Sequence, residues 1–305
     1  MSLETQYLYT IGTVLSGLCF IICTLICSAI IFSRKTRRKS FNLYVVALIV
    51  PDIIVNLVSL VVNIIELSED EHVESLSHGT CVFIASVSGY YIYTNLWTSA
   101  LICYEVYWLL KKSSSAERYK PTEVKVVLLR VVALHVSAVL GAVIIYVLLP
   151  LVGIDITENP CLGTQQEETF IITMILVLIT ILPPLLYICY VTVDVYKRNL
   201  LPPAGKSRFV ATFFIRTVLL TIIFTLALAS TLTLRKRAAS KAFDFLRSGQ
   251  GIVIAGMSLM KPDIQKTTLH FVTCGMFREK VSGPNINAHR SLDPRSISTF
   301  FRNFF

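Results

Sequence analysis

The sequence predicts an all-α membrane protein, a bundle of seven transmembrane helices, and two observations support this. The chain has 305 residues, of which 54% are hydrophobic and only 15% charged, with a mean hydropathy of +0.67. A soluble domain of this composition would have too little polar surface. The apolar residues also gather in seven long runs, and a helix needs about 20 such residues to cross a bilayer.

No linker rich in proline, glycine or serine divides the chain, so we expect one transmembrane domain over 1–265 and a short cytoplasmic tail over 266–305. The expected spans are 8–32, 42–66, 82–110, 126–150, 169–193, 209–234 and 239–261. The last span is the weakest, because Lys241, Asp244 and Arg247 lie in its first half. It crosses the membrane only if those charges face other helices or the outer interface.

The loops between the runs alternate in charge. "SRKTRRKS" after the first run has five basic residues and no acid, whereas "ELSEDEHVES" after the second has five acids and neither lysine nor arginine. Basic loops concentrate on the cytoplasmic side, so we expect the amino terminus outside and the carboxyl terminus in the cytoplasm. "RKRAASKAFDFLR" is basic yet expected outside: either it forms an anion-attracting mouth, or the last span is wrong. The net charge of +9 indicates attraction to inner-leaflet lipids and not nucleic-acid binding.

Eight cysteines are present, and six lie inside or close to apolar runs, where cysteine acts as a small hydrophobe. Only Cys81 and Cys161 fall in regions expected outside, where conditions are oxidising, so we predict a disulfide between them. Cys274 follows the last span and is either an acylation site or an ordinary free thiol. The histidines and cysteines form no ligand set, so the sequence predicts no metal site, no cofactor and no enzyme activity.

The second run carries a polar stripe. Its members are spaced by four and three residues, which puts them on one helical face: Asp52, Asn56, Ser59, Asn63 and Glu66. Lipid offers no hydrogen-bond partner, so the stripe should face the bundle. There Asp52 must be neutral or paired. The stripe is either polar packing between helices or a switch or ion site.

The third run has two faces. One is an aromatic ridge of Ser86, Tyr90, Tyr93, Trp97, Tyr104 and Tyr107 or Trp108, which serves either packing or ligand binding. The other is more polar and contains Tyr91, Asn95, Thr98, Ile102 and Glu105. Asn95 should reach the depth of Asp52 and could hydrogen-bond to it. Glu105 shares its depth with Arg216 on the sixth span, its preferred partner, and with Arg130 on the fourth, the alternative. Otherwise Glu105 is protonated or pairs with Lys111 or Lys112.

Three segments carry a family resemblance. "NLYVVALIVPD" resembles the Asn-then-Asp signature of the second helix in rhodopsin-like receptors. "WTSALICYEVY" resembles the third helix of cyclic-AMP-type receptors and is similar to the Trp-x-x-x-Glu pattern of secretin-like ones. "SGQGIVIAGMSLMKPDIQ" is similar to the opening of the last helix in those two groups. The chain therefore resembles the seven-helix G-protein-coupled receptors.

The chain also departs from the rhodopsin-like pattern. Glu-Val-Tyr stands where an acid-Arg-Tyr triplet is usual, the last helix has "MKPDI" in place of Asn-Pro-x-x-Tyr, and the first span lacks asparagine. These departures favour the cyclic-AMP-like branch. The resemblance implies a plasma-membrane receptor that relays an extracellular ligand signal to a cytoplasmic heterotrimeric G protein. We expect an outer cleft, with an anionic ligand bound by Tyr90, Tyr93, Trp97, Lys241, Arg247 and Gln250.

A second hypothesis is a transporter or ion channel. Its ion path would use the polar side chains of Asp52, Asn56 and Asn95. Many transporters are built from internal repeats, and the absence of a repeat in this sequence counts against this hypothesis.

Overall fold

A computed structural model of the chain describes residues 3–68, 78–114, 122–145, 167–200 and 237–273, and these residues form helices and short connections without a strand. The helices are α1 (Leu3–Phe32), α2 (Arg34–Arg37), α3 (Ser40–Ser68), α4 (His78–Ser114), α5 (Val124–Val143), α7 (Glu167–Lys197), α9 (Arg237–Leu259) and α10 (Pro262–Val272). Five of the predicted spans thus coincide with α1, α3, α4, α5 and α7, and the seventh with α9. The sixth, 209–234, lies outside the described residues.

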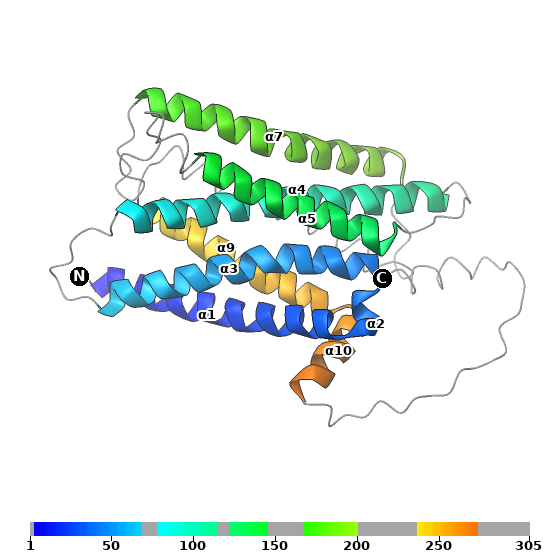
Figure 1. Ribbon diagram of the computed structural model, residues 1–305, viewed down its shortest axis with the longest axis horizontal. Coiled ribbons are helices and arrows are strands. Elements are labelled where there is room, and N and C mark those ends of the chain that lie inside the picture. The colour runs from blue at the N-terminus through cyan, green and yellow to red at the C-terminus, as the bar shows by residue number, and fades with distance from the viewer. Residues whose placement is uncertain (1–2, 69–77, 115–121, 146–166, 201–236, 274–305) are drawn as a thin grey trace, which may run out of the picture.

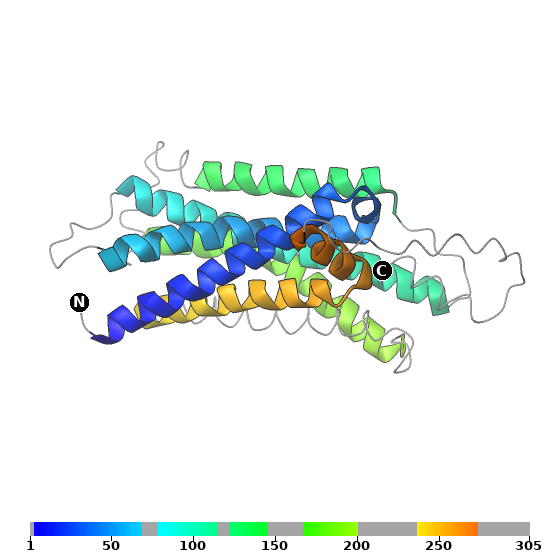
Figure 2. The same cartoon turned by 90° about the horizontal axis from the view of Figure 1, so that it is seen from below.

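The long helices run side by side as a bundle (Figures 1 and 2). Helix α1 packs against α3 and α9, while α4 contacts α3, α5 and α7, and α5 also contacts α3. Helix α10 leaves the bundle at the end where α2 joins α1 to α3 (Figure 1). The packing places α3 and α4 at the centre, where their polar residues meet those of the other helices.

The surface of the bundle is apolar, as a lipid-facing surface must be. Four described helices are long and apolar enough to cross a membrane, within Tyr9–Phe32, Ser40–Ile65, Val124–Val143 and Ile179–Lys197. On α5 the side chains of Leu128, Leu129, Val132, Val136 and Leu140 are all exposed. Helices α4 and α9 are less apolar because polar residues lie on their buried faces, which the next subsection describes.

Helix α9 approaches α1 and α3 closely at Gly251. A Cβ atom at this position would collide with Cys19 Sγ and lie 3.4 Å from the carboxyl of Asp52. Cys19, Cys23 and the Gly251 backbone are buried together, and the Cys23 thiol donates a 3.9 Å hydrogen bond to the Gly251 carbonyl. Glycine is therefore required here to bring the α9 backbone beside the Asp52 carboxyl group.

The end of α7 is fixed by a left-handed residue. Asn199 has a φ of 50°. The Leu200 amide donates to the Val195 carbonyl and the Asn199 amide to the Tyr196 carbonyl, both at 3.1 Å. This hydrogen-bond pair is the Schellman motif, in which asparagine or glycine accepts the positive φ. The motif determines where α7 stops and so where its last polar side chains lie.

Candidate functional site

The polar stripe of α3 faces the bundle, as the sequence predicts. Asp52 and Asn56 are fully buried and Asn63 is nearly so. The Asn56 amide donates to the Asp52 backbone carbonyl at 2.7 Å and accepts from the Ser248 hydroxyl of α9 at 2.8 Å. Ser248 also lies 3.4 Å from the Ser16 hydroxyl of α1. A buried chain of hydrogen bonds therefore joins α1, α3 and α9 at the depth of Asn56.

A buried arginine of α9 extends this polar region. The Arg247 guanidinium donates to the Ser59 hydroxyl of α3 and lies 5.9 Å from the centre of the Tyr91 ring on α4. Both Arg247 and Asp52 are close enough to Tyr91 to act on it electrostatically. The bundle interior thus contains a cation and a carboxyl group near the same phenol.

The Glu105 carboxyl group at the other end of α4 is bound by three side chains, which come from α3, from α5 and from the residues just before α5. The Arg130 Nη1 atom of α5 lies 2.8 Å from Glu105 Oε1. The Thr122 hydroxyl donates to both carboxylate oxygens at 2.9 and 2.8 Å, and the Tyr44 hydroxyl of α3 donates at 3.3 Å. The Glu105 side chain is 5% exposed and that of Arg130 36% exposed, so the pair lies at the edge of the buried region.

Of the partners predicted for Glu105, the structure contains the alternative one. Arg130 forms the ion pair, while the preferred Arg216 lies outside the described residues. The Lys111 amine lies over the aromatic rings of Tyr107 and Trp108, at 5.7 and 5.1 Å from their centres. At the carboxyl-terminal end of α4, Glu105 therefore pairs with an arginine of α5, and the Lys111 amine lies on aromatic faces.

Tyr107, two residues after Glu105, makes a second polar contact on the other side of α4. Its hydroxyl donates a 2.8 Å hydrogen bond to Asp194 Oδ2 of α7, and Arg198 Nε lies 2.8 Å from Asp194 Oδ1. The hydrogen bond to Asp194 raises the pKa of the Arg198 guanidinium above its ordinary value. Sequence analysis missed Asp194 and Arg198, although an acid and a base four residues apart at the end of a span are a recognisable pair.

A comparison with protein families decides what this bundle is. The model of the seven-transmembrane receptors of the rhodopsin family matches residues 23–260. The chain belongs to this receptor family. It is a seven-transmembrane receptor of the G-protein-coupled type, a multi-pass protein of the plasma membrane. The preference for the cyclic-AMP-like branch is not confirmed by this match. A comparison with curated proteins found no match.

The receptor does not form the hydrogen bond predicted between Asn95 and Asp52. Asn95 is buried, but its oxygen accepts from Gln250 of α9 at 3.5 Å, and its Nδ2 atom has no hydrogen-bond partner among the described residues. The reason is orientation, because the Asn95 side chain meets the side chain of Gln250, one residue before Gly251. Gln250 and Asn95 thus join α9 to α4, while Asp52 lies against Gly251.

The residues suggested for ligand binding divide into two groups in the receptor. The aromatic ridge faces α5 and α7: the Tyr90 hydroxyl lies 2.8 Å from His135 Nδ1, Tyr93 accepts from the Ser137 hydroxyl at 3.3 Å, and the Trp97 indole donates to the Thr180 carbonyl at 3.1 Å. Arg247 and Gln250 instead lie on the α3 and α4 side of α9. The structure therefore does not bring Tyr90, Tyr93 and Trp97 together with Arg247 and Gln250 around one point.

Some predicted residues lie outside what the structure describes. These are Cys161, Cys274, Arg216 and the side chains of Cys81 and Lys241. Cysteines 19, 23, 27, 103 and 189 have free thiols. Among the described residues no group of histidine, cysteine and acidic side chains is arranged to hold a metal ion. The Cys81–Cys161 disulfide and the acylation of Cys274 stay predictions.

Proposed function

We propose that the Glu105–Arg130 pair holds the receptor inactive, and that an anionic ligand bound from outside releases it to couple a heterotrimeric G protein on the cytoplasmic face. The ion pair is the observation that carries this proposal. Glu105 belongs to α4 and Arg130 to α5, so any movement that separates the inner ends of these helices must break their 2.8 Å contact. In rhodopsin-like receptors an arginine of the third helix has this locking role. Here the polarity would be reversed, since the acid is on α4 and the arginine is on the neighbouring α5.

Burial explains why the contact would resist opening. The Glu105 carboxyl group is almost completely buried and accepts hydrogen bonds from Arg130, Thr122 and Tyr44. Removing one partner from such a group leaves a buried acceptor or charge uncompensated. A G protein that binds only the open form would have to supply this free energy, which makes the closed form the resting state.

The polar network around Asp52 is the second part of the proposal. Asp52, Asn56 and Asn95 would transmit ligand binding from the outer half of the bundle to its inner end. The support is connectivity: Asn56 contacts α9 through Ser248, and Asn95 contacts α9 through Gln250. A shift of α9 on ligand binding would change hydrogen bonds on both α3 and α4.

The anionic character of the ligand is inferred from charge. Residues 235–247, a stretch that the sequence predicts to lie outside the cell, contain five basic residues and one acid. An anion is the ligand that such a stretch would attract. Lys241→Gln should therefore weaken the response to an anionic agonist, whereas Lys266→Gln on α10, at the opposite end of the bundle, should leave its potency unchanged.

The test uses the full-length receptor in lipid nanodiscs with a purified heterotrimer. The receptor should accelerate guanine-nucleotide exchange, and Glu105→Gln should accelerate it further without ligand. A parallel flux assay in proteoliposomes addresses the transporter or channel hypothesis. Ion flux that depends on Asp52, together with no effect of any variant on nucleotide exchange, would overturn the receptor mechanism proposed here.

A further inference from the structure

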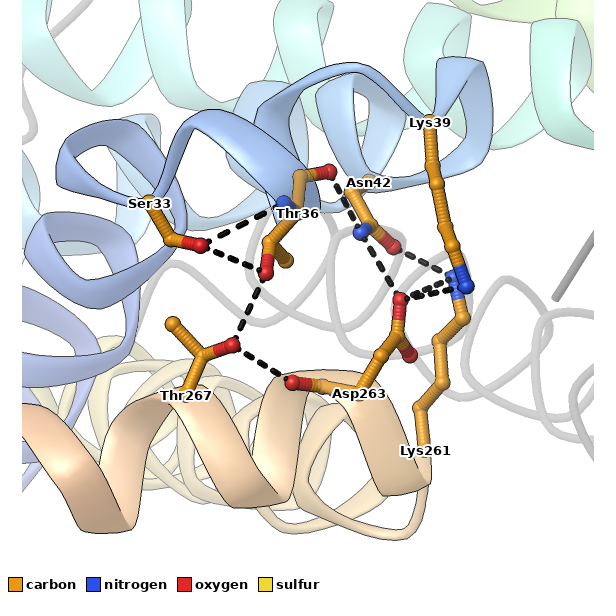
Figure 3. Close-up of polar contacts among 7 residues, drawn as sticks. All are labelled: Ser33, Thr36, Lys39, Asn42, Lys261, Asp263 and Thr267. Atoms are coloured by element: carbon orange, nitrogen blue, oxygen red, sulfur yellow. Dashed lines mark hydrogen bonds and ion pairs between the residues drawn. The ribbon is translucent and has the colours of Figure 1, made fainter. Parts of the chain in front are cut away.

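The corner between α9 and α10 contains a buried lysine. Lys261 follows the end of α9 and precedes Pro262, the first residue of α10. Its side chain is 1% exposed, and lysine is almost never buried to this extent unless it is paired. The amine points toward Asn42 at the start of α3 and toward Asp263 of α10 (Figure 3). This lysine stands where rhodopsin-like receptors carry the asparagine of Asn-Pro-x-x-Tyr.

Lys261 has three kinds of partner. Its amine donates to the Asn42 side-chain oxygen, lies 3.5 Å from Asp263 Oδ2 and sits 5.1 Å from the centre of the Phe41 ring. An amine over an aromatic face gains further electrostatic stabilisation. Asn42 in turn donates to Asp263 Oδ2 at 3.2 Å and to the Thr36 carbonyl at 2.8 Å. The lysine, the asparagine and the aspartate therefore bind one another in a closed set.

Two further contacts lie at the rim of this set. The Lys39 amine lies 3.1 Å from Asp263 Oδ2, so two lysines share one carboxylate oxygen. The Thr36 and Thr267 hydroxyls are 2.8 Å apart and join α2 to α10 (Figure 3). Burial alone would raise the pKa of the Asp263 carboxyl group, but Lys261, Lys39 and Asn42 outweigh burial and lower it.

These contacts tie α9 to α3 at a second depth. Ser248 of α9 binds Asn56 of α3 inside the bundle, and Lys261 binds Asn42 at its inner end. Asn42 and Asn56 are 14 residues apart, which is about 21 Å along a helix. Two contacts that far apart prevent α9 from tilting or sliding along α3 unless one of them breaks.

We propose that Lys261, Asp263, Asn42 and Lys39 form a clamp that holds α9 and α10 to α3 as one rigid unit when the inner face opens. Lys261 is the positioning residue of this clamp. The inference rests on the proposed function for one point, namely that opening separates α4 from α5. Helix α4 would then move relative to α3. The corner between α9 and α10, where Lys261 replaces the asparagine of Asn-Pro-x-x-Tyr, would stay fixed.

The experiment measures two distances by pulsed electron paramagnetic resonance on the full-length receptor in nanodiscs. Labels are introduced as non-natural amino acids, which leaves the native cysteines in place. One pair, Arg38 with His270, lies within the clamped unit; the other, Arg38 with Lys112, runs from it to α4. G protein should shift the second distance and leave the first unchanged. A shift of equal size in both would overturn the clamp.

Variants test the clamp without G protein. Lys261→Met should broaden the Arg38–His270 distribution, while the matched control Lys266→Met, on the exposed face of α10, should not. A lower unfolding temperature with an unchanged distribution would mean that Lys261 only stabilises the fold, and would overturn the proposal. If Lys261→Met does not fold, Lys39→Met is the substitute. It removes the more exposed of the two lysines that bind Asp263, and it should broaden the Arg38–His270 distribution less than the loss of Lys261 would.

Basal nucleotide exchange gives a separate measurement. A clamp that directs opening to α4 should let Lys261→Met change basal exchange by at least about fivefold, the lower end of typical coupling between sites. If neither the parent nor Glu105→Gln stimulates exchange, the proposed function fails, yet the distance distributions still decide whether the clamp exists.

Discussion

Tyr107 donates a 2.8 Å hydrogen bond to Asp194 of α7, while Glu105, two residues earlier, binds Arg130 of α5 at the same distance. Val106 between them is buried. The two polar residues of the Glu-Val-Tyr triplet therefore attach α4 to helices on opposite sides. This is how the carboxyl-terminal end of α4 is held in a receptor that lacks the family's arginine at this point.

Glu105→Gln should raise basal signalling. Glutamine keeps the size of the side chain but cannot form an ion pair with Arg130, so the α4–α5 contact weakens by about 1–3 kcal/mol. A double-mutant cycle with Arg130→Gln, read by nucleotide exchange, checks this. The reversed pair, Glu105→Arg with Arg130→Glu, should partly restore the parent. Independent effects at 105 and 130 would show that the ion pair has no role in the resting state.

Tyr107→Phe should loosen the contact between α4 and α7. Only the hydroxyl is lost, so the expected cost is about 1 kcal/mol. The same change in an Asp194→Asn background should cost less, because the charged acceptor is already gone. The measurement is the thermal unfolding midpoint of the four proteins in detergent. Equal losses in both backgrounds would mean that the hydroxyl stabilises the receptor through something other than Asp194.

Asn199→Val should destabilise the end of α7. A β-branched residue at a φ of 50° is strained, and the left-handed region costs an ordinary L-residue about 1–2 kcal/mol. Asn199→Gly provides the matched control, since glycine adopts a positive φ without strain and should stay within about 0.5 kcal/mol of the parent. Thermal unfolding compares the two variants; a valine variant as stable as the glycine variant would contradict the assigned cap.

Asp52→Asn should change signalling more than folding. The substitution keeps the shape of the side chain beside Gly251 but removes the titratable carboxyl group. We expect altered ligand-dependent exchange with an unfolding midpoint close to that of the parent. If ligand response and ion sensitivity both match the parent, the stripe of α3 serves packing alone.

Acid should weaken the clamp at the α9–α10 corner. The pKa of Asp263 is lowered in the folded receptor, so its stabilising contribution is present above the ordinary carboxyl pKa and disappears as the pH falls through the lowered value. The unfolding midpoints of the parent and Asp263→Asn should differ by a constant amount above the ordinary carboxyl pKa of roughly 3.9. Below that pH the difference should shrink as the pH falls toward about 3. A difference independent of pH would exclude this titration.

The sequence is a good guide to helices and to which faces are buried, because both depend on local pattern. The apolar runs predict α1, α3, α4, α5 and α7 to within several residues. Likewise, the spacing of Asp52, Asn56 and Asn63 predicts a stripe directed into the bundle, and all three are buried. In each case the period of the helix and the absence of hydrogen-bond partners in lipid suffice.

Contacts between helices could not be predicted in the same way. Asn95 and Asp52 share a depth, but hydrogen bonding also requires that two helices present those side chains to each other, and helix rotation is set by packing. Asn95 therefore meets Gln250. The Lys261–Asn42 contact was missed because its two members are 219 residues apart and each belongs to a motif that was interpreted alone.

The three glycines of α9 differ in how easily evolution can substitute them, and Gly251 is the most constrained. A Cβ atom on Gly249 or Gly256 would meet nothing within 4 Å, so alanine could replace either and favour the helix by up to about 1 kcal/mol. At 251 the same replacement would push α9 away from Cys19 and from the Asp52 carboxyl group. Among descendants of this chain, Gly249 and Gly256 can be lost by drift, whereas Gly251 can change only after a smaller residue appears at position 19.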